Sequence, residues 1–334
     1  MKTVFRRALL VITATILTVS FTACKGSAGN GSDHKEPGKG AQKGMNTYNI
    51  GRFSIDVPTE MKEAGRTHEF RYAEIEEFLW PKNVDREEAR KEAWARRIAE
   101  INSNRPPRGI KKIIVETKES LSVGKWSKGV LYYGNDMSSK DGFWMIMADY
   151  GQVGAIFIIK GLIEYEEPMF DDLLEIARNY EPMKQDKVDS FHTAYGNITL
   201  PYLEQESSYV RFEGHPLDLM LEIEMTETNN VEESGPVERL AAAISTNFAP
   251  TVDVKKIRAR KKNVAGLEGE ELVVRLTDGG ESELHFGWEY AGKQDSGEYP
   301  LIQIEMESPD GRVEEKLKVW DAILGSMKSL YKGK

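Results

Sequence analysis

Residue types that carry enzyme chemistry are sparse in this chain, which has five histidines and one cysteine among 334 residues. The sequence contains no Gly-x-Ser-x-Gly elbow, no His-Glu-x-x-His helix and no glycine-rich phosphate loop of the required spacing. His285 falls on the polar side of an alternating segment, where a cross-strand contact is expected rather than proton transfer. Asn135, Asp136 and Asp141 crowd a turn but lack the alternating carboxylates of a calcium loop. We therefore expect no catalytic residue, no metal and no cofactor.

The single cysteine, Cys24, has a different use. Residues 1–23 carry three basic residues, then a 14-residue apolar or hydroxylated run, then small residues, which is typical of a signal peptide. A membrane-spanning helix needs roughly 20 apolar residues, so the transmembrane alternative is weaker. The segment Phe21-Thr22-Ala23-Cys24 resembles the lipobox of bacterial lipoproteins, with phenylalanine in place of the usual leucine-like residue. The resemblance implies acyl chains on Cys24, each contributing ~0.8 kcal/mol per buried methylene. An incidental cysteine beside an ordinary cleavage site is the alternative.

Residues 24–44 read as a flexible tether, because the segment after Cys24 contains six glycines and no large apolar residue. A coil of this length has a root-mean-square reach of roughly 25 Å. Lys25, in place of an aspartate, is compatible with the outer membrane more than with the inner membrane, so we expect a periplasmic protein anchored there through Cys24. The formal charge of −9 becomes −12 without the three basic signal residues. This charge argues against nucleic acid and against electrostatic adhesion to anionic lipid.

Residues 45–185 are predicted to form a first α+β domain. Phe53, Ile55 and Val57 alternate with polar residues in a strand that ends at Pro58, and Asp85 stands at a helix start. That helix should run to about residue 102. Three apolar strands and a second helix should follow, at residues 129–133, 142–150, 154–159 and 168–180.

Residues 186–334 are predicted to repeat the same order of elements as a second α+β domain, after a polar segment at 183–190. A helix should begin at Pro236, and a terminal helix should present Val313, Leu317, Trp320 and Leu324 as one stripe. The fold class is therefore α+β, with two tandem similar domains, each a mainly antiparallel sheet packed with helices.

The second domain is organised around a meander at residues 264–308. Strands are expected at 271–276, 283–290 and 301–306, with Asp278-Gly279-Gly280 supplying the positive φ of a tight hairpin. The polar link from Ala291 to Pro300 reads as an exposed loop that is free to meet a partner.

Several motifs of this second domain occur in a familiar order: VAGLEGEEL from Val264, FGWEYAGK from Phe286, IEM from Ile304 and VWDAIL from Val319. Over about residues 198–330 they resemble the carboxy-terminal domain of immunity proteins against type VI secretion lipases. The first domain matches only in its general pattern. The resemblance implies a periplasmic protein that binds a phospholipase effector and inhibits it, without catalysis of its own, by occluding its lid or active-site entrance.

Two domains joined by a short segment leave a cleft that could seize such a lid or loop. We expect acidic contacts to the effector at Glu268, Glu270, Glu289 and Asp295, although Glu268 and Glu270 could simply decorate a turn. The competing hypothesis is a PsbP-like envelope lipoprotein that binds another component of the cell envelope. An enzyme is the third possibility, disfavoured by the absence of catalytic motifs.

Overall fold

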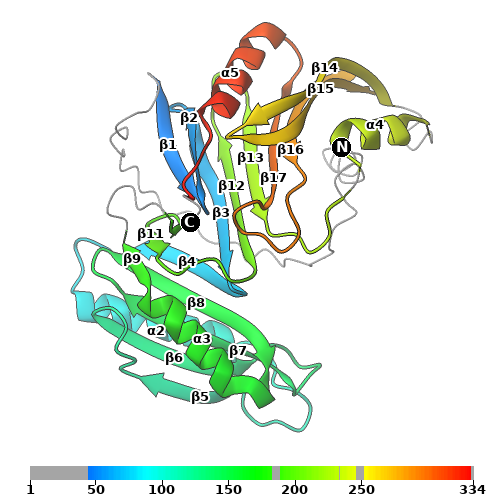
Figure 1. Ribbon diagram of the computed structural model, residues 1–334. Helices are drawn as coiled ribbons and strands as arrows, with labels where there is room; N and C mark the ends of the chain where they lie inside the picture. Colours follow the sequence, from blue (N-terminus) through cyan, green and yellow to red (C-terminus); the bar gives the residue numbers. More distant parts are fainter. Residues whose placement is uncertain (1–43, 183–188, 233, 246–251, 332–334) are drawn as a thin grey trace.

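One large antiparallel sheet dominates the computed structural model, which describes residues 44–182, 189–232, 234–245 and 252–331 (Figure 1). Cys24, the signal peptide and the tether lie outside the described residues. The sheet has twelve strands in the order β14-β15-β16-β17-β13-β12-β3-β4-β8-β7-β6-β5. The six strands from β3 to β5 in this order come from the amino-terminal part of the chain, which we call the first half. The six from β14 to β12 come from the carboxy-terminal part, which we call the second half.

The first half contains six strands of this sheet and the helices between them. They are β3 (Lys62–Phe70), β4 (Ala73–Leu79), α2 (Arg86–Asn102), β5 (Ile114–Glu119), β6 (Trp126–Tyr133), β7 (Asp141–Asp149), β8 (Val153–Leu162), η1 (Ile163–Tyr165) and α3 (Glu166–Arg178). The Asp85 side chain caps α2, because it accepts hydrogen bonds from the backbone N–H groups of Glu87 and Glu88, both at 3.0 Å.

The second half repeats this sequence of elements. It consists of β12 (Glu206–Glu213), β13 (Met220–Thr226), α4 (Pro236–Ser245), β14 (Val252–Val264), β15 (Leu267–Asp278), β16 (Glu281–Tyr290), β17 (Leu301–Pro309) and α5 (Val313–Ser326). Spatially, β12-β13-β17-β16-β15-β14 matches β3-β4-β8-β7-β6-β5 strand for strand. The prediction of two tandem α+β units is confirmed, and the antiparallel pairing of β3 with β12 joins them into one sheet.

Two small sheets show that each half contributes strands to the core of the other half. One consists of β1 (Met45–Ile50), β2 (Phe53–Pro58) and β18 (Lys328–Ser329), and the other of β9 (Tyr180–Pro182), β10 (Phe191–His192) and β11 (Gly196–Ile198). The side chains of β2 pack in the core of the second half, whereas Phe191 and Ile198 pack in the core of the first. Each core thus draws on both sides of the predicted boundary between residues 185 and 186. Residues 183–188 are outside the described part of the chain.

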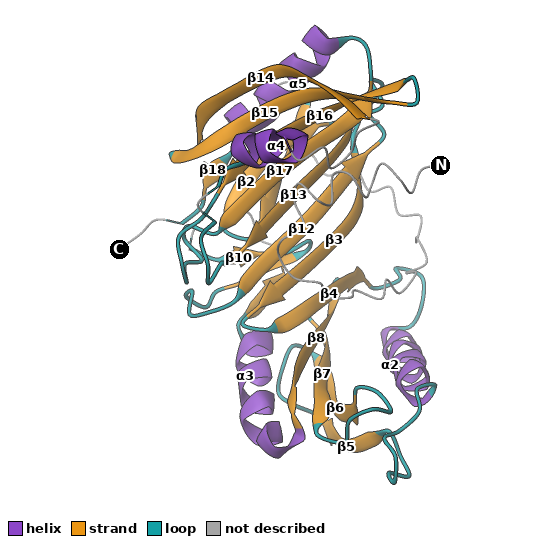
Figure 2. Cartoon of the chain, turned by 90° about the vertical axis from the view of Figure 1, so that its right-hand side faces the viewer, coloured by secondary structure: helices purple, strands orange, loops and turns teal. Residues whose placement is uncertain are grey.

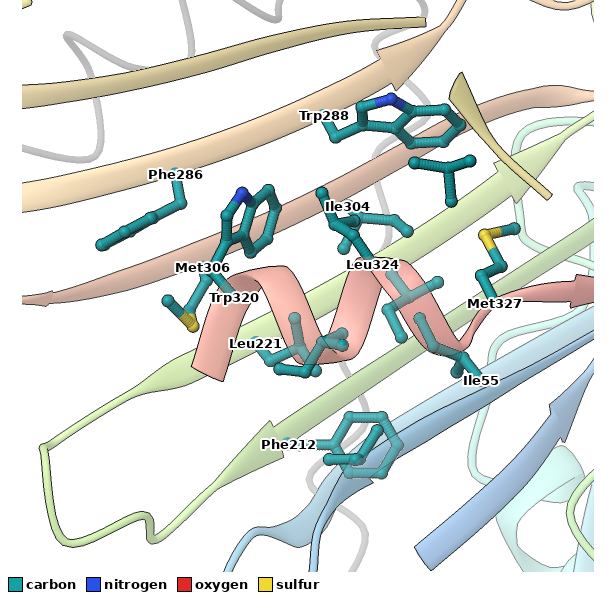
Figure 3. Packing of buried hydrophobic residues seen from close by; sticks show 14 of the residues in the cluster. Ile55, Phe212, Leu221, Phe286, Trp288, Ile304, Met306, Trp320, Leu324 and Met327 are labelled. Atoms are coloured by element: carbon teal, nitrogen blue, oxygen red, sulfur yellow. The ribbon is translucent and has the colours of Figure 1, made fainter. Parts of the chain in front are cut away.

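Helix α5 and the inner face of the second half form the largest core. Trp320, Leu324 and Met327 pack against Phe286, Trp288, Ile304 and Met306, as Figure 3 shows. Trp320 is fully buried, and its indole N–H donates to Oε1 of the equally buried Glu271 at 2.8 Å. The helical stripe predicted for α5 is therefore confirmed.

The strand predictions for the meander hold, but the sequence did not predict β14. This strand carries six basic residues, so it lacks an apolar alternation. Long-range ion pairs help to hold it instead. Arg258 and Lys262 reach Asp321 on α5, each at 2.9 Å, and both approach the buried Glu271 carboxylate. Between β15 and β16, Gly279 and Gly280 have φ of 58° and 88°, as the hairpin prediction requires.

Candidate functional site

The two faces of the large sheet differ in what covers them. On one face, α3 and α5 pack with the two small sheets. On the opposite face, α2 is tied to β4 by the ion pair between Arg97 and Glu76, and α4 is tied to β16 by Arg239 and Glu289. Figure 2 shows α4 over the second half and α2 beside the first, with β13, β12 and β3 running between them. The middle of this face is therefore uncovered in the described part of the chain.

Glutamates line this uncovered surface, which we call the glutamate face. Glu222 on β13 lies directly opposite Glu305 on β17, and Glu224 opposite Gln303. Because directly paired residues point to one side of a sheet, the register extends the surface through β12 to β3 and β4. The glutamate face comprises Glu69, Glu74, Glu222, Glu224, Glu305 and Glu307.

Sequence reasoning missed these residues, although a signal was present. Both β13 and β17 contain a glutamate at every second position, Glu222 and Glu224 in one strand and Glu305 and Glu307 in the other. Alternation with buried leucine, isoleucine and methionine places the four carboxylates on the same outer side. What the pattern could not supply is the register that sets Glu222 against Glu305.

Two carboxylates of the glutamate face, those of Glu305 and Glu224, have raised pKa values. Burial, followed by repulsion from Glu307 and Glu222, raises the pKa of Glu305 to about 7. Burial likewise raises the pKa of Glu224, with a further contribution from Glu222. Groups whose charged form is disfavoured in this way are common at binding and catalytic sites, although structural networks produce them too.

A cavity of about 70 Å³ lies between α4 and the edge of the glutamate face. Leu272, Val274 and Leu276 provide its apolar lining, and Arg239, His285, Glu305 and Glu307 contribute polar groups. Neither ring nitrogen of His285 has a hydrogen-bond partner in the described residues, although Nδ1 lies 3.3 Å from Oε1 of Glu307. The cavity thus combines an apolar floor with a wall that carries carboxyl groups.

Two of the predicted contact residues, Glu270 and Glu289, face each other across β15 and β16 beneath α4. Glu289 is only 10% exposed, binds Arg239 at 2.6 Å and accepts from Nε2 of Gln303 at 2.9 Å. Its carboxylate is therefore already engaged within the chain, where it fixes α4 to the sheet. Oε2 of Glu270 is buried without a hydrogen-bond partner among the described residues.

The other two predicted contacts, Glu268 and Asp295, are exposed and lie apart from that pair. Asp295 belongs to the link from Ala291 to Pro300, which is not the free loop expected from the sequence. The backbone N–H of Asp295 donates to the carbonyl of Thr228 at 2.8 Å, and Gly297 is buried against the Tyr202 ring. The link is thus tied down, with the Asp295 side chain projecting from it.

One serine and one histidine do meet at the joint between the halves, but their geometry is not that of a nucleophile and base. His68 Nδ1 lies 2.9 Å from Ser208 Oγ, and Nε2 lies 3.3 Å from the Arg66 guanidinium. Because arginine only donates, Nε2 must accept, so Nδ1 carries the proton and cannot remove one from the serine. Ser208 is also just 2% exposed.

The described residues also lack two other kinds of site, a metal centre and a membrane-spanning helix. Across residues 44–182, 189–232, 234–245 and 252–331, no group of three or more histidine, aspartate or glutamate side chains is arranged to hold a metal ion. No helix in these ranges is long and apolar enough to cross a membrane.

Comparison with known proteins finds a family model that matches the second half. Residues 195–329 match the family model described as the Tle cognate immunity protein 4 C-terminal domain. This segment is therefore similar to that domain family. The predicted relationship to immunity proteins of type VI lipase effectors, strongest in the carboxy-terminal half, is thereby confirmed. No curated protein sequence matches the chain.

Solved structures extend the likeness of this Tli4-type fold to the first half. The apo immunity protein TplEi of the type VI secretion system of Pseudomonas aeruginosa has a TM-score of 0.70 at 19% identity, covering 86% of this chain and 97% of that one. A chain of the Tle4–Tli4 complex has a TM-score of 0.71 at 18% identity, with coverage of 86% and 98%. TplEi bound to an "L" peptide has a TM-score of 0.65 at 18% identity, with coverage of 86% of this chain and 98% of that one. At these identities the likeness concerns the fold.

Proposed function

We propose that this protein is an immunity protein that binds a type VI secretion phospholipase effector and inhibits it. The match of residues 195–329 to the Tle cognate immunity protein 4 C-terminal domain carries the proposal. The fold shared with Tli4 over 86% of the chain supports it. The effector is the partner by analogy with the Tle4–Tli4 complex.

Inhibition requires no chemistry from this chain. A protein that holds the lid of a lipase, or fills its active-site entrance, denies lipid access to the nucleophile. The described residues offer a large rigid sheet for this purpose, and the one serine–histidine contact at the joint has the wrong donor arrangement for catalysis. We therefore infer a binding protein rather than an enzyme, with Glu268 and Asp295 as exposed acidic contacts at its periphery.

We further propose that the protein works in the periplasm, anchored through acyl chains on Cys24, to the outer membrane rather than the inner. Residues 1–23 and the position of Cys24 support this proposal. A flexible tether would keep the protein close to the lipid that the effector attacks, which raises its effective concentration there.

A protection assay tests the function. Bacteria that export the cognate phospholipase effector to their own periplasm should lyse unless they also produce the full chain. Purified full-length protein in detergent should bind the same effector in a 1:1 mixture and suppress its phospholipid hydrolysis. Lysis that continues despite normal levels of the chain, together with undiminished hydrolysis, would refute the proposal.

The anchor is tested separately. Labelled palmitate should enter the wild type but not Cys24→Ser, and the variant should leave the membrane fraction while still inhibiting the effector in solution. Label that appears in Cys24→Ser would contradict attachment at this residue.

A further inference from the structure

We propose that the glutamate face and the adjoining apolar cavity together form the docking surface for a basic segment of the partner protein. Arginine or lysine side chains of that segment would lie between the glutamates, and a neighbouring apolar side chain would enter the cavity beneath α4. This inference rests on the proposed function, because it names the surface and the chemistry through which the effector would be held.

The first argument is that the like charges of the glutamate face lower the stability of the folded protein. Glu222 and Glu305 are direct cross-strand partners, an arrangement that destabilises a sheet when both carry the same charge. Glu224 and Glu307 flank them on the same side of the same two strands. Of these four glutamates in the described strands, only Glu222 has a lysine or arginine as its direct partner on the other side, Arg211 of β12.

The second argument is that the chain supplies little positive charge to this surface. Within the described residues, Glu224 and Glu305 form no ion pair. Arg211 lies 3.6 Å from Glu222 but is bonded to Glu213. Arg239, which borders the cavity, is shared by Glu232 and Glu289. The glutamates therefore offer acceptors that a cationic partner can use.

The cavity is an independent observation that points to the same occupant. Its floor of Leu272, Val274 and Leu276 is apolar, whereas its wall includes Glu305 and Glu307. An apolar side chain entering it would bring the adjacent residues of its own segment against these carboxylates. The buried ring of His285, 11% exposed and without hydrogen-bonded nitrogens among the described residues, lines the same space.

Other occupants fit less well. Anionic lipid and nucleic acid are repelled by a surface of glutamates. A metal ion would need three or more convergent ligands, and the described residues provide no such group. A basic protein segment satisfies both the charge and the apolar cavity, and a negative surface also accelerates its encounter with a positive partner.

The experiment compares four variants of the full chain in binding to the effector that the wild type neutralises. Glu222→Lys with Glu305→Lys reverses the surface, and Glu222→Gln with Glu305→Gln removes its charge with little risk to folding. Gly287→Val fills the cavity, because a Cβ at Gly287 meets only the Leu272 carbonyl, at 3.9 Å. The matched control, Glu164→Lys with Asp172→Lys, makes the same charge change at exposed positions near α3, away from the glutamate face.

We expect the double lysine variant to weaken binding about 100-fold or more, and the glutamine and valine variants about 10-fold, at unchanged circular dichroism. The control should change binding less than about threefold. Equal losses in the control would show that net charge, and not the glutamate face, determines binding, and would refute the proposal. Unchanged binding by the two glutamate variants would also overturn it.

A defined probe separates this inference from the proposed function. A fluorescein-labelled peptide of alternating leucine and arginine should bind the wild type, lose binding to the double lysine variant, and bind less well when serine replaces leucine. If no phospholipase effector is neutralised, the proposed function fails, and the peptide result alone decides whether the surface accepts basic apolar segments. Equal peptide binding by all variants would then refute the inference.

Discussion

Replacing Glu305 by glutamine should stabilise the protein at neutral and alkaline pH but not in acid. In the folded protein the pKa of Glu305 is about 7, because burial and the neighbouring Glu307 and Glu222 disfavour its charge. In the unfolded chain the pKa is the ordinary 4.5. The folded state therefore binds the proton more tightly, and folding stability falls as pH rises from 4.5 to 7.

The magnitude follows from the separation of the two pKa values. Each unit is worth about 1.4 kcal/mol, so full ionisation costs up to about 3 kcal/mol above pH 7. Glutamine resembles the protonated glutamate and avoids this cost. Glu305→Gln should thus raise the free energy of unfolding by about 2 to 3 kcal/mol at pH 8 and by almost nothing at pH 4.

Urea denaturation followed by tryptophan fluorescence measures this effect, because Trp288 and Trp320 are buried in the adjacent core. Glu281→Gln, at the exposed start of the neighbouring strand β16, is the matched control and should have no comparable effect. Adding Glu222→Gln should give less than the sum of the two single effects, since each glutamate repels the other. A gain for Glu305→Gln that is equal at pH 4 and pH 8 would refute the electrostatic reasoning.

Three further substitutions test how the halves and the core are held. Arg52→Met should lower the free energy of unfolding by roughly 3 to 5 kcal/mol in denaturant titrations, because it leaves the buried Glu206 carboxylate, 2.7 Å from Arg52 Nε, without its ion-pair partner. Combining Arg52→Met with Glu206→Gln should recover part of this loss. Glu77→Gln should cost about 1 to 3 kcal/mol in the same titrations, since the carboxylate accepts from Tyr180 at 2.6 Å and from two backbone N–H groups. An effect below about 0.5 kcal/mol, roughly half of one typical hydrogen bond, would argue against these bonds. Trp320→Phe should cost about 1 to 3 kcal/mol in thermal and urea unfolding, because a buried carboxylate loses its indole donor; a neutral result would show that water replaces it.

The success of sequence reasoning followed the range of the interactions that determine each feature. The stripe of α5, the cap of α2 at Asp85 and the hairpin at Gly279 depend on residues a few positions apart, and all three were predictable. Strand β14 was missed because Arg258 and Lys262 are stabilised by Asp321, about sixty residues away in the chain.

The exchange of small sheets between the halves was not predictable for the same reason. The repeated order of elements in the sequence correctly indicated a repeat. Periodicity says nothing, however, about which core a strand enters. Phe191 follows the predicted boundary between residues 185 and 186, yet it packs in the core of the first half, where its ring lies 5.2 Å from that of Phe70.

The substitution Glu305→Gln can distinguish whether this residue of the glutamate face serves solubility or effector binding. If Glu305 serves only solubility, Glu305→Gln should gain stability at pH 8 and leave effector binding unchanged. If it serves binding, the same substitution should gain stability and lose affinity, because the carboxylate that burdens the free protein is the one that a basic partner would neutralise. A partner cation would also lower the pKa of Glu305, so binding should strengthen between pH 6 and pH 8 in the wild type. Glu305→Gln should flatten this pH dependence, and the nearby Glu222, Glu224 and Glu307 would account for any slope that remains. A wild-type affinity that is constant over this range, measured alongside the predicted stability gain, would assign the carboxylate to solubility alone.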